Sequence, residues 1–143
     1  MNKHHINRLE KLYTFLGTVK PEKFDFSSWA QGSHCGDIEQ NINACGTTAC
    51  AMGWAGSMPE FRKRGLKLVW KQNSTGGFVI FTDQDGESFY GDEAGEVFFG
   101  LTAKEANYLF IPCSLEDENM PLCQYRQRLR KFIDRKKRTL GIK

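Results

Sequence analysis

The segment 45–56 combines two cysteines with small, almost uncharged side chains. It predicts a buried helix, closely approached by its neighbours, that begins at Thr47 or Thr48, whose hydroxyl is suited to cap it. Cys50 would then lie in the first turn, where free backbone N–H groups and the helix dipole lower the pKa of a thiol. The pattern therefore suggests a reactive cysteine.

A nucleophilic cysteine needs a base, and the histidines are His4, His5 and His34, all upstream. Only His34 is suited to pair with Cys50 or Cys45. The alternative is that both cysteines are small apolar core residues, as free cysteines usually are. We favour the interpretation that both cysteines are core residues. An enzyme that uses Cys50 as nucleophile and His34 as base is kept as an alternative.

The same segment has the composition of an anion-binding helix start. Gly46, Thr47 and Thr48 would present backbone N–H groups to a phosphate. Aromatic and basic side chains from nearby segments would add ring stacking and positive charge, although large aromatics are more often core residues. The predicted ligand-binding residues are Gly46, Thr47, Thr48, Trp29, Trp54, Arg62 and Arg64.

Metal sites have weaker support. The candidate zinc ligands are poorly spaced, because C-x4-C is at the edge of the usual range and an adjacent His and Cys can hardly bind one ion. A calcium loop aligned on Gly86 would put Phe81, which lacks a side-chain oxygen, at its first ligand position. We expect no cofactor and a simple turn at 83–86; the zinc candidates are His34, Cys35, Cys45 and Cys50.

Carboxylates cluster downstream without helical pairing to a histidine, so we expect a solvated acidic rim rather than an acid–base pair. Phosphate-loop, dinucleotide and esterase signatures are absent. The rim consists of Asp83, Asp85, Glu87, Asp92, Glu93 and Glu96.

Apolar periodicity and turn residues predict the elements that position these groups. Helices are expected at about 5–18, 92–99 and 102–110, the last with a capping box, and a β-hairpin at about 66–82 followed by a strand at 88–90. A C-terminal amphipathic helix lies in the basic tail, about 119–143. This order indicates an α+β fold with a small antiparallel sheet.

The chain has 143 residues, 40% of them hydrophobic, with eleven Phe, which fits one domain over residues 1–143 with a real core. It has no apolar run long enough for a membrane span and no apolar leader at Met1, so we expect a cytoplasmic protein. The five cysteines are then expected to be reduced: Cys35, Cys45, Cys50, Cys113 and Cys123.

Charge is distributed unevenly along the chain. From Arg126 onward there are nine basic residues and one acid, Asp134, which leaves eleven basic and sixteen acidic residues before it. The tail helix either closes the core with a solvated basic face or meets phosphates or an acidic protein. Direct nucleic-acid binding, not favoured, would use Arg126, Arg128, Arg130 and Lys131.

Several motifs together resemble a group of small proteins encoded by bacteriophages and some bacteria. They are Cys-Gly-Thr-x-x-Cys-x-x-Gly at 45–53, Phe-Phe-Gly-Leu-Thr at 98–102, Glu-Ala at 105–106 and Leu-Phe-Ile-Pro at 109–112, within a resemblance that spans about 24–112. The long loop between Trp29 and Cys45 and the basic tail depart from the group. The resemblance implies an accessory protein of a phage or mobile element that counters host immunity.

The leading hypothesis is a non-enzymatic counter-defence protein that binds and sequesters an anionic small molecule, a nucleotide signal. The alternatives are a protein–protein inhibitor that covers a host immune effector with its charged surfaces, and the cysteine-dependent enzyme. No membrane partner is expected, and a homo-oligomer is compatible with the sequence.

Overall fold

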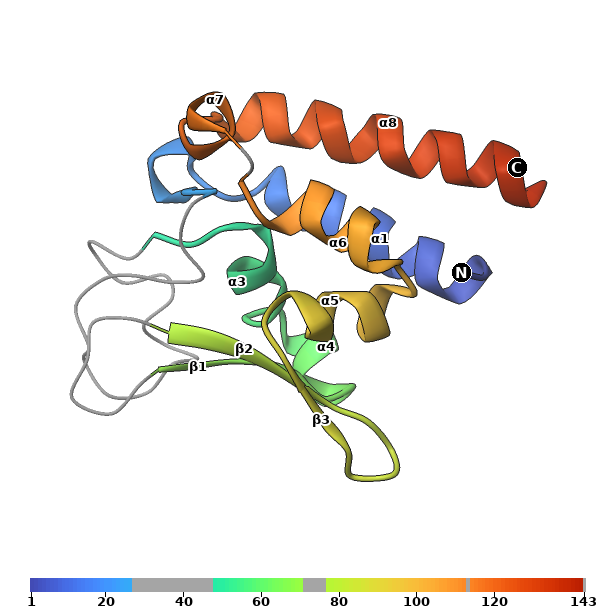
Figure 1. The fold of residues 1–143 in the computed structure, drawn as a ribbon. Coiled ribbons are helices and arrows are strands. Elements are labelled where there is room, and N and C mark those ends of the chain that lie inside the picture. The colour runs from blue at the N-terminus through green and yellow to red at the C-terminus, as the bar shows by residue number, and fades with distance from the viewer. Residues whose placement is uncertain (27–47, 71–76, 113, 143) are drawn as a thin grey trace.

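Helices surround a small sheet in the order expected for an α+β domain (Figure 1). The structure is a computed structural model that describes residues 1–26, 48–70, 77–112 and 114–142. Its elements in chain order are α1 (Lys3–Leu16), the 3-10 helix η1 (Pro21–Lys23), α3 (Ala51–Ala55), α4 (Pro59–Lys63), β1 (Leu66–Trp70), β2 (Gly77–Thr82), β3 (Ser88–Tyr90), α5 (Asp92–Phe99), α6 (Ala103–Phe110), α7 (Leu115–Glu118) and α8 (Leu122–Leu140).

The described strands form an antiparallel sheet in the order β1-β2-β3. β1 pairs with β2 from Leu66 opposite Phe81 to Trp70 opposite Gly77, which confirms the predicted hairpin. Most of its predicted loop lies outside the described residues. Alternate positions of the two strands are buried, as expected for a sheet covered on one face: Leu66, Leu68, Val79 and Phe81.

The connection between β2 and β3 is the predicted turn. The side chain of Asp83 accepts hydrogen bonds from the backbone N–H groups of Asp85 (3.0 Å) and Glu87 (2.9 Å). Gly86 has a φ of +83°, a conformation that favours glycine. Asp83 therefore serves the turn itself.

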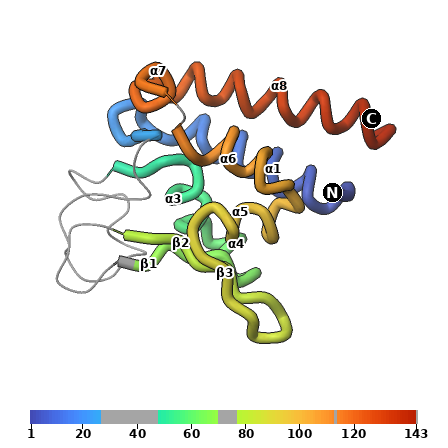
Figure 2. The backbone as a smooth tube through the Cα atoms, in the orientation of Figure 1, coloured from blue at the N-terminus to red at the C-terminus, as the bar shows by residue number. Residues whose placement is uncertain are grey.

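The helices stack in layers above the sheet. α1 contacts α8 on one side and α3 and α5 on the other, and α3 and α5 contact the sheet. Figure 1 shows this order from α8 to the sheet, and the tube in Figure 2 follows the same path. The two ends of the chain lie on the same side of the molecule.

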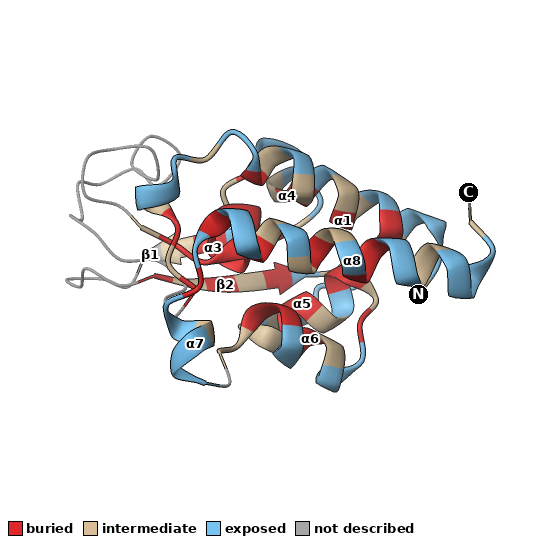
Figure 3. Ribbon diagram, turned by 90° about the horizontal axis from the view of Figure 1, so that it is seen from above, coloured by how far each residue is buried: buried red, intermediate tan, exposed pale blue. Residues whose placement is uncertain are grey.

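The basic C-terminal helix packs on its own domain. Its apolar residues fall on one face, as predicted from their helical spacing, and that face is buried against the body of the molecule (Figure 3). Burial of each large apolar side chain contributes roughly 1.5–3 kcal/mol. The buried residues are Leu122, Tyr125, Leu129, Phe132 and Ile133.

Two helix starts differ from the prediction. α1 begins at Lys3 because the Asn2 side chain accepts a hydrogen bond from the backbone of His5 while the His5 ring accepts one from the Asn2 backbone, a reciprocal cap. α3 begins only at Ala51, not at Thr48. Ala49 instead pairs in an extended conformation with residues 23–25, through Ala49 N to Lys23 O (3.1 Å) and Asp25 N to Ala49 O (3.0 Å).

Candidate functional site

The short helix α4 carries basic residues at a corner of the fold that is tightly fixed. Phe61 anchors it in the core, with its ring centroid 4.9 Å from that of Phe98. Beyond α4, Gly65 has a φ of +101°, and a Cβ there would overlap the carbonyl oxygen of Thr82. Only glycine lets the chain turn this close to β2, so the position of the corner is well defined.

A surface pocket of about 510 Å³ lies beside this corner. Its volume falls within the range of small-molecule sites. Three of the described lining residues are cations and none is an acid, so the pocket favours a negatively charged ligand. The lining residues are Ser57, Pro59, Arg62, Lys63 and Lys67.

Arg62 is held in place by the backbone around the pocket. Its Nη1 donates to the carbonyl oxygens of Gly56 (3.0 Å) and Leu68 (3.3 Å). Lys63 and Lys67 are exposed and form no ion pair with a described residue. The pocket thus combines one fixed cation with two that extend from exposed positions.

Arg64 belongs to a different part of the surface. The charge of Arg8 is the largest cause of the lowered pKa of His4, and burial, Arg64 and Lys11 lower it further. The pKa of Arg8 is lowered chiefly by burial and then by the charge of Arg64. Arg64 therefore extends the positive surface toward α1, while Arg62 is the predicted arginine that lines the pocket.

The thiol of Cys50 does not have the properties of an activated nucleophile. Cys50 is the residue before α3, and burial raises the pKa of its thiol to about 11. Backbone N–H groups of Gly53 and Met52 act in the opposite direction but are outweighed. This is the reverse of the predicted lowering, and the proposed base, His34, lies outside the described residues.

Trp54 is not available as a stacking platform. Its side chain is 1% exposed, and its Nε1 donates to the carbonyl oxygen of Lys23 (3.1 Å). It is therefore a core residue, which corrects its predicted role. The predicted site residues Trp29, Gly46 and Thr47 lie outside the described residues, and Thr48 is half-buried beside the pairing with residues 23–25.

Among the residues that the structure describes, no group of three or more His, Cys, Asp or Glu side chains could hold a metal ion. Three of the four zinc candidates lie outside them. The acidic residues are distributed over the β2–β3 turn and α5, where Asp92 and Glu93 form the first turn. Negative charge at that position suits the helix dipole.

Three of the tail arginines contact their own domain. Arg126 donates through Nε to the carbonyl oxygen of Tyr13 (3.2 Å), and its guanidinium lies 4.1 Å from the centre of that ring. Arg130 pairs with Asp134 of the same helix (2.9 Å) and with Glu10 of α1 (3.9 Å). These arginines, predicted as possible nucleic-acid contacts, instead help to dock α8.

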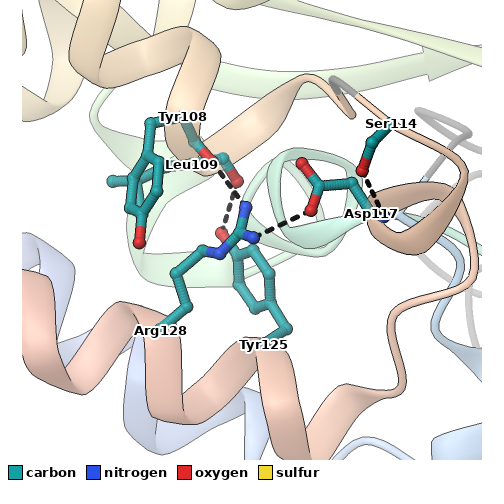
Figure 4. Close-up of polar contacts among 6 residues, drawn as sticks. All are labelled: Tyr108, Leu109, Ser114, Asp117, Tyr125 and Arg128. Atoms are coloured by element: carbon teal, nitrogen blue, oxygen red, sulfur yellow. Dashed lines mark hydrogen bonds and ion pairs between the residues drawn. The ribbon is translucent and has the colours of Figure 1, made fainter.

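Arg128 is more enclosed than Arg130, with 18% of its side chain exposed against 32%. Figure 4 shows its guanidinium between the Tyr108 carbonyl, at 3.0 Å from Nη1, and a carboxylate oxygen of Asp117, at 2.9 Å from Nη2. Beside it, the hydroxyl of Tyr125 donates to the carbonyl oxygen of Leu109 (2.8 Å). Together these bonds connect α8 to the end of α6 and to α7.

Of the five described lining residues of the pocket, only Arg62 was among the predicted ligand-binding residues, and two of the four others are instructive. The alternation in Leu66-Lys67-Leu68 was a usable signal, because it places Lys67 on the exposed face of β1. Ser57 had no such signal: it lines the pocket because its hydroxyl donates to the carbonyl oxygen of Trp54 (2.6 Å) at the end of α3.

No protein-family model matches this chain, and neither a curated protein nor a solved structure matches it. None of the helices in the described part of the chain is long and apolar enough to cross a membrane.

Proposed function

We propose that this protein binds and sequesters an anionic small molecule, a phosphate-bearing nucleotide, in the pocket beside α4. The observation that carries the proposal is the convergence of Arg62, Lys63 and Lys67 on one pocket whose described lining contains no acid. In this proposal the protein is a counter-defence accessory protein of a phage or mobile element. The motif resemblance at 45–53 and 98–112 supports that biological setting.

The three cations have different roles in this proposal. Arg62 supplies a charge at a fixed place, because two backbone carbonyls hold its guanidinium. Lys63 and Lys67 reach the phosphate with flexible side chains and act as point charges. Ser57 already donates its hydroxyl proton to Trp54, so it offers the ligand an acceptor, and Pro59 provides apolar contact.

We propose binding rather than catalysis. A thiol with a pKa of about 11 is almost entirely protonated at neutral pH and is a poor nucleophile. Cys50 is also buried in the core, whereas the cationic pocket opens at the surface. Replacing Cys50 with Ser should therefore leave ligand binding nearly unchanged.

The first experiment is to purify the protein from cells, denature it and identify the released small molecules by mass spectrometry. Isothermal titration calorimetry then measures the Kd of the native protein for the recovered nucleotide, or for a panel of nucleoside phosphates and cyclic dinucleotides. A nucleotide that binds in a one-to-one ratio supports the proposal. Failure of every member of the panel to bind contradicts it.

A variant pair locates the site. The Lys63→Ala/Lys67→Ala variant should weaken binding by about tenfold or more, since each hydrogen bond to a charged group contributes roughly 1.5–3 kcal/mol. The matched control is Lys3→Ala/Lys20→Ala, which removes the same charge from exposed positions on α1 and just before η1. Equal affinity of the two variants would place the ligand elsewhere.

A second candidate is inhibition of a host immune effector through protein contacts. On the acidic rim, Tyr90 at the end of β3 is 58% exposed and Val97 on α5 is 38% exposed. Exposed apolar side chains among charged ones are a feature of protein interfaces. If this function is correct, Tyr90→Ala should abolish inhibition of the host system while nucleotide binding in the α4 pocket persists.

A further inference from the structure

The cations of α8 divide into two sets. One set contacts the domain itself and includes Arg128, which pairs with Asp117, and Lys136, which pairs with Glu105. The other set is exposed and forms no ion pair with a described residue: Lys131, Arg135 and Arg138.

The exposed set forms a stripe along one face of the helix. Its positions are four and three residues apart, the spacing that places side chains on one face. The stripe extends for about 10 Å along the helix axis at 1.5 Å per residue. Three like charges so close together repel one another, so the stripe favours a partner that carries several negative charges.

The stripe borders a groove between α6 and α8. The groove has a volume of about 460 Å³ and is lined by residues of both helices and of the turn before α6: Thr102, Lys104, Glu105, Tyr108, Phe132 and Arg135. Glu105 is the acid among them, and its carboxylate is already paired with Lys136 and accepts the backbone N–H of Thr102 (3.0 Å). The remaining charge in the groove, from Lys104 and Arg135, is positive.

Tyr108 gives this surface an exposed aromatic ring. Its side chain is 46% exposed, while the guanidinium of Arg128 lies 4.6 Å from the centre of the ring. Because Arg128 is itself fixed by Asp117 and by the Tyr108 carbonyl, the ring is supported from one side (Figure 4). An exposed, supported ring beside cations is the arrangement on which unpaired bases stack.

We propose that this face of α6 and α8 binds single-stranded nucleic acid, with Tyr108 stacking on a base and Lys104, Lys131, Arg135 and Arg138 contacting phosphates. A single strand satisfies both features, since it offers repeated phosphates and unstacked bases. An acidic protein would complement the positive charge but would offer no base to stack on the Tyr108 ring. A duplex keeps its bases stacked on one another. None of the residues that line the α4 pocket belongs to this surface.

The test is fluorescence anisotropy of a short labelled oligothymidylate with the full chain over a series of salt concentrations. For single strands, the slope of log K against log salt is about −0.7 for each neutralised phosphate. The Lys131→Gln/Arg135→Gln/Arg138→Gln variant should therefore lower the magnitude of the slope by about 2. An unchanged slope and affinity would overturn the proposal.

The ring is tested separately. Tyr108→Ala should weaken binding by about fivefold or more with little change in the salt slope, and Tyr108→Phe, which keeps the ring, should bind as the native chain does. Lys63→Ala/Lys67→Ala should leave oligothymidylate binding unchanged, which separates this site from the α4 pocket. Unfolding temperatures of all variants, measured by circular dichroism, verify that these exposed substitutions leave the fold intact.

Competitors decide the class of the partner. Unlabelled oligothymidylate should displace the probe, whereas polyglutamate of equal charge and duplex DNA of equal length should compete much more weakly. Equal competition by polyglutamate would show that the stripe recognises acidic surfaces in general and would overturn the assignment. Equal competition by the duplex would also overturn it, because a duplex does not present bases to Tyr108.

Discussion

Burial, not the helix terminus, determines the chemistry of Cys50. The thiol lies in the core just before α3, where loss of solvent raises its pKa to about 11 despite the backbone donors of the helix. The described part of the segment that first suggested a nucleophile, 48–56, is thus a packing element. The same burial applies to Trp54, whose polar N–H has a backbone partner as buried tryptophans usually do.

Cys50 is therefore expected to resist thiol reagents at neutral pH, while the exposed Cys123 reacts readily. Because its pKa is raised, the thiolate of Cys50 becomes abundant only as the pH approaches about 11. Time-resolved labelling with iodoacetamide, followed by peptide mass spectrometry, measures both rates in one sample. Equal labelling of the two residues at pH 7 would contradict the buried position of Cys50.

The hydroxyl of Tyr125 contributes one buried hydrogen bond, to the carbonyl oxygen of Leu109. Tyr125→Phe should lower the free energy of unfolding by about 1–2 kcal/mol, because the carbonyl loses its side-chain partner inside the core. Urea denaturation measures this loss. Tyr90→Phe, at an exposed position, is the matched control and should leave the free energy of unfolding unchanged.

At the scale of the element, patterns within one segment predicted most of the structure. The capping box at Thr102 and Glu105 is formed as predicted, and the apolar spacing of α8 placed its buried face correctly. The start of α3 was not predictable in this way, because it depends on Ala49 pairing with residues 23–25, far away in sequence. For the same reason, Arg62 and Lys67 could be found separately but not assigned to one pocket.

The corner between α4 and β1 depends on Gly65. Gly65→Ala should lower the free energy of unfolding by several kcal/mol, because the new methyl group would overlap the Thr82 carbonyl and φ is +101°. Gly86→Ala is the control, since Gly86 also has a positive φ but nothing lies within 4 Å of its added Cβ. Gly86→Ala should lower the free energy of unfolding by about 1 kcal/mol.

Urea denaturation of the two glycine variants separates two effects. Gly86→Ala introduces backbone strain alone, whereas Gly65→Ala adds a steric overlap to that strain. Equal losses of stability would mean that the corner adjusts easily and that Thr82 does not restrict it. Because Arg62 and Lys67 flank this corner, the Gly65 variant should also weaken nucleotide binding in the α4 pocket, while the Gly86 variant should not.

At the scale of the whole molecule, the charge asymmetry of the sequence serves partly to hold the fold together. The acidic body and the basic tail meet where α8 lies on α1 and α6, through pairs such as Lys137 with Glu10 and Lys136 with Glu105. Half-exposed pairs of this kind contribute little each. The main stabilisation of α8 must therefore come from its apolar face, and the exposed cations Lys131, Arg135 and Arg138 are not needed to hold the helix in place.

This division of roles predicts different outcomes for two truncations of the chain. Ending the chain after Tyr125 removes Leu129, Phe132 and Ile133, all buried, and losing each such side chain costs roughly 2–5 kcal/mol. The sum is comparable with the total stability of about 5–15 kcal/mol that native domains have. Ending it after Arg138 removes residues that are exposed or half-buried wherever the structure describes them, at 139–142, and should leave thermal unfolding nearly unchanged.

Circular dichroism melting and the dispersion of proton NMR signals distinguish these outcomes. The short chain should show no cooperative unfolding transition, and the chain ending at Arg138 should unfold like the native protein and keep its affinity for oligothymidylate, because Lys131, Arg135 and Arg138 are retained. A cooperative transition in the short chain would show that the rest of the domain folds without most of α8. In that case the basic tail would be free to leave the domain, and the groove beside α6 would not exist as a fixed site.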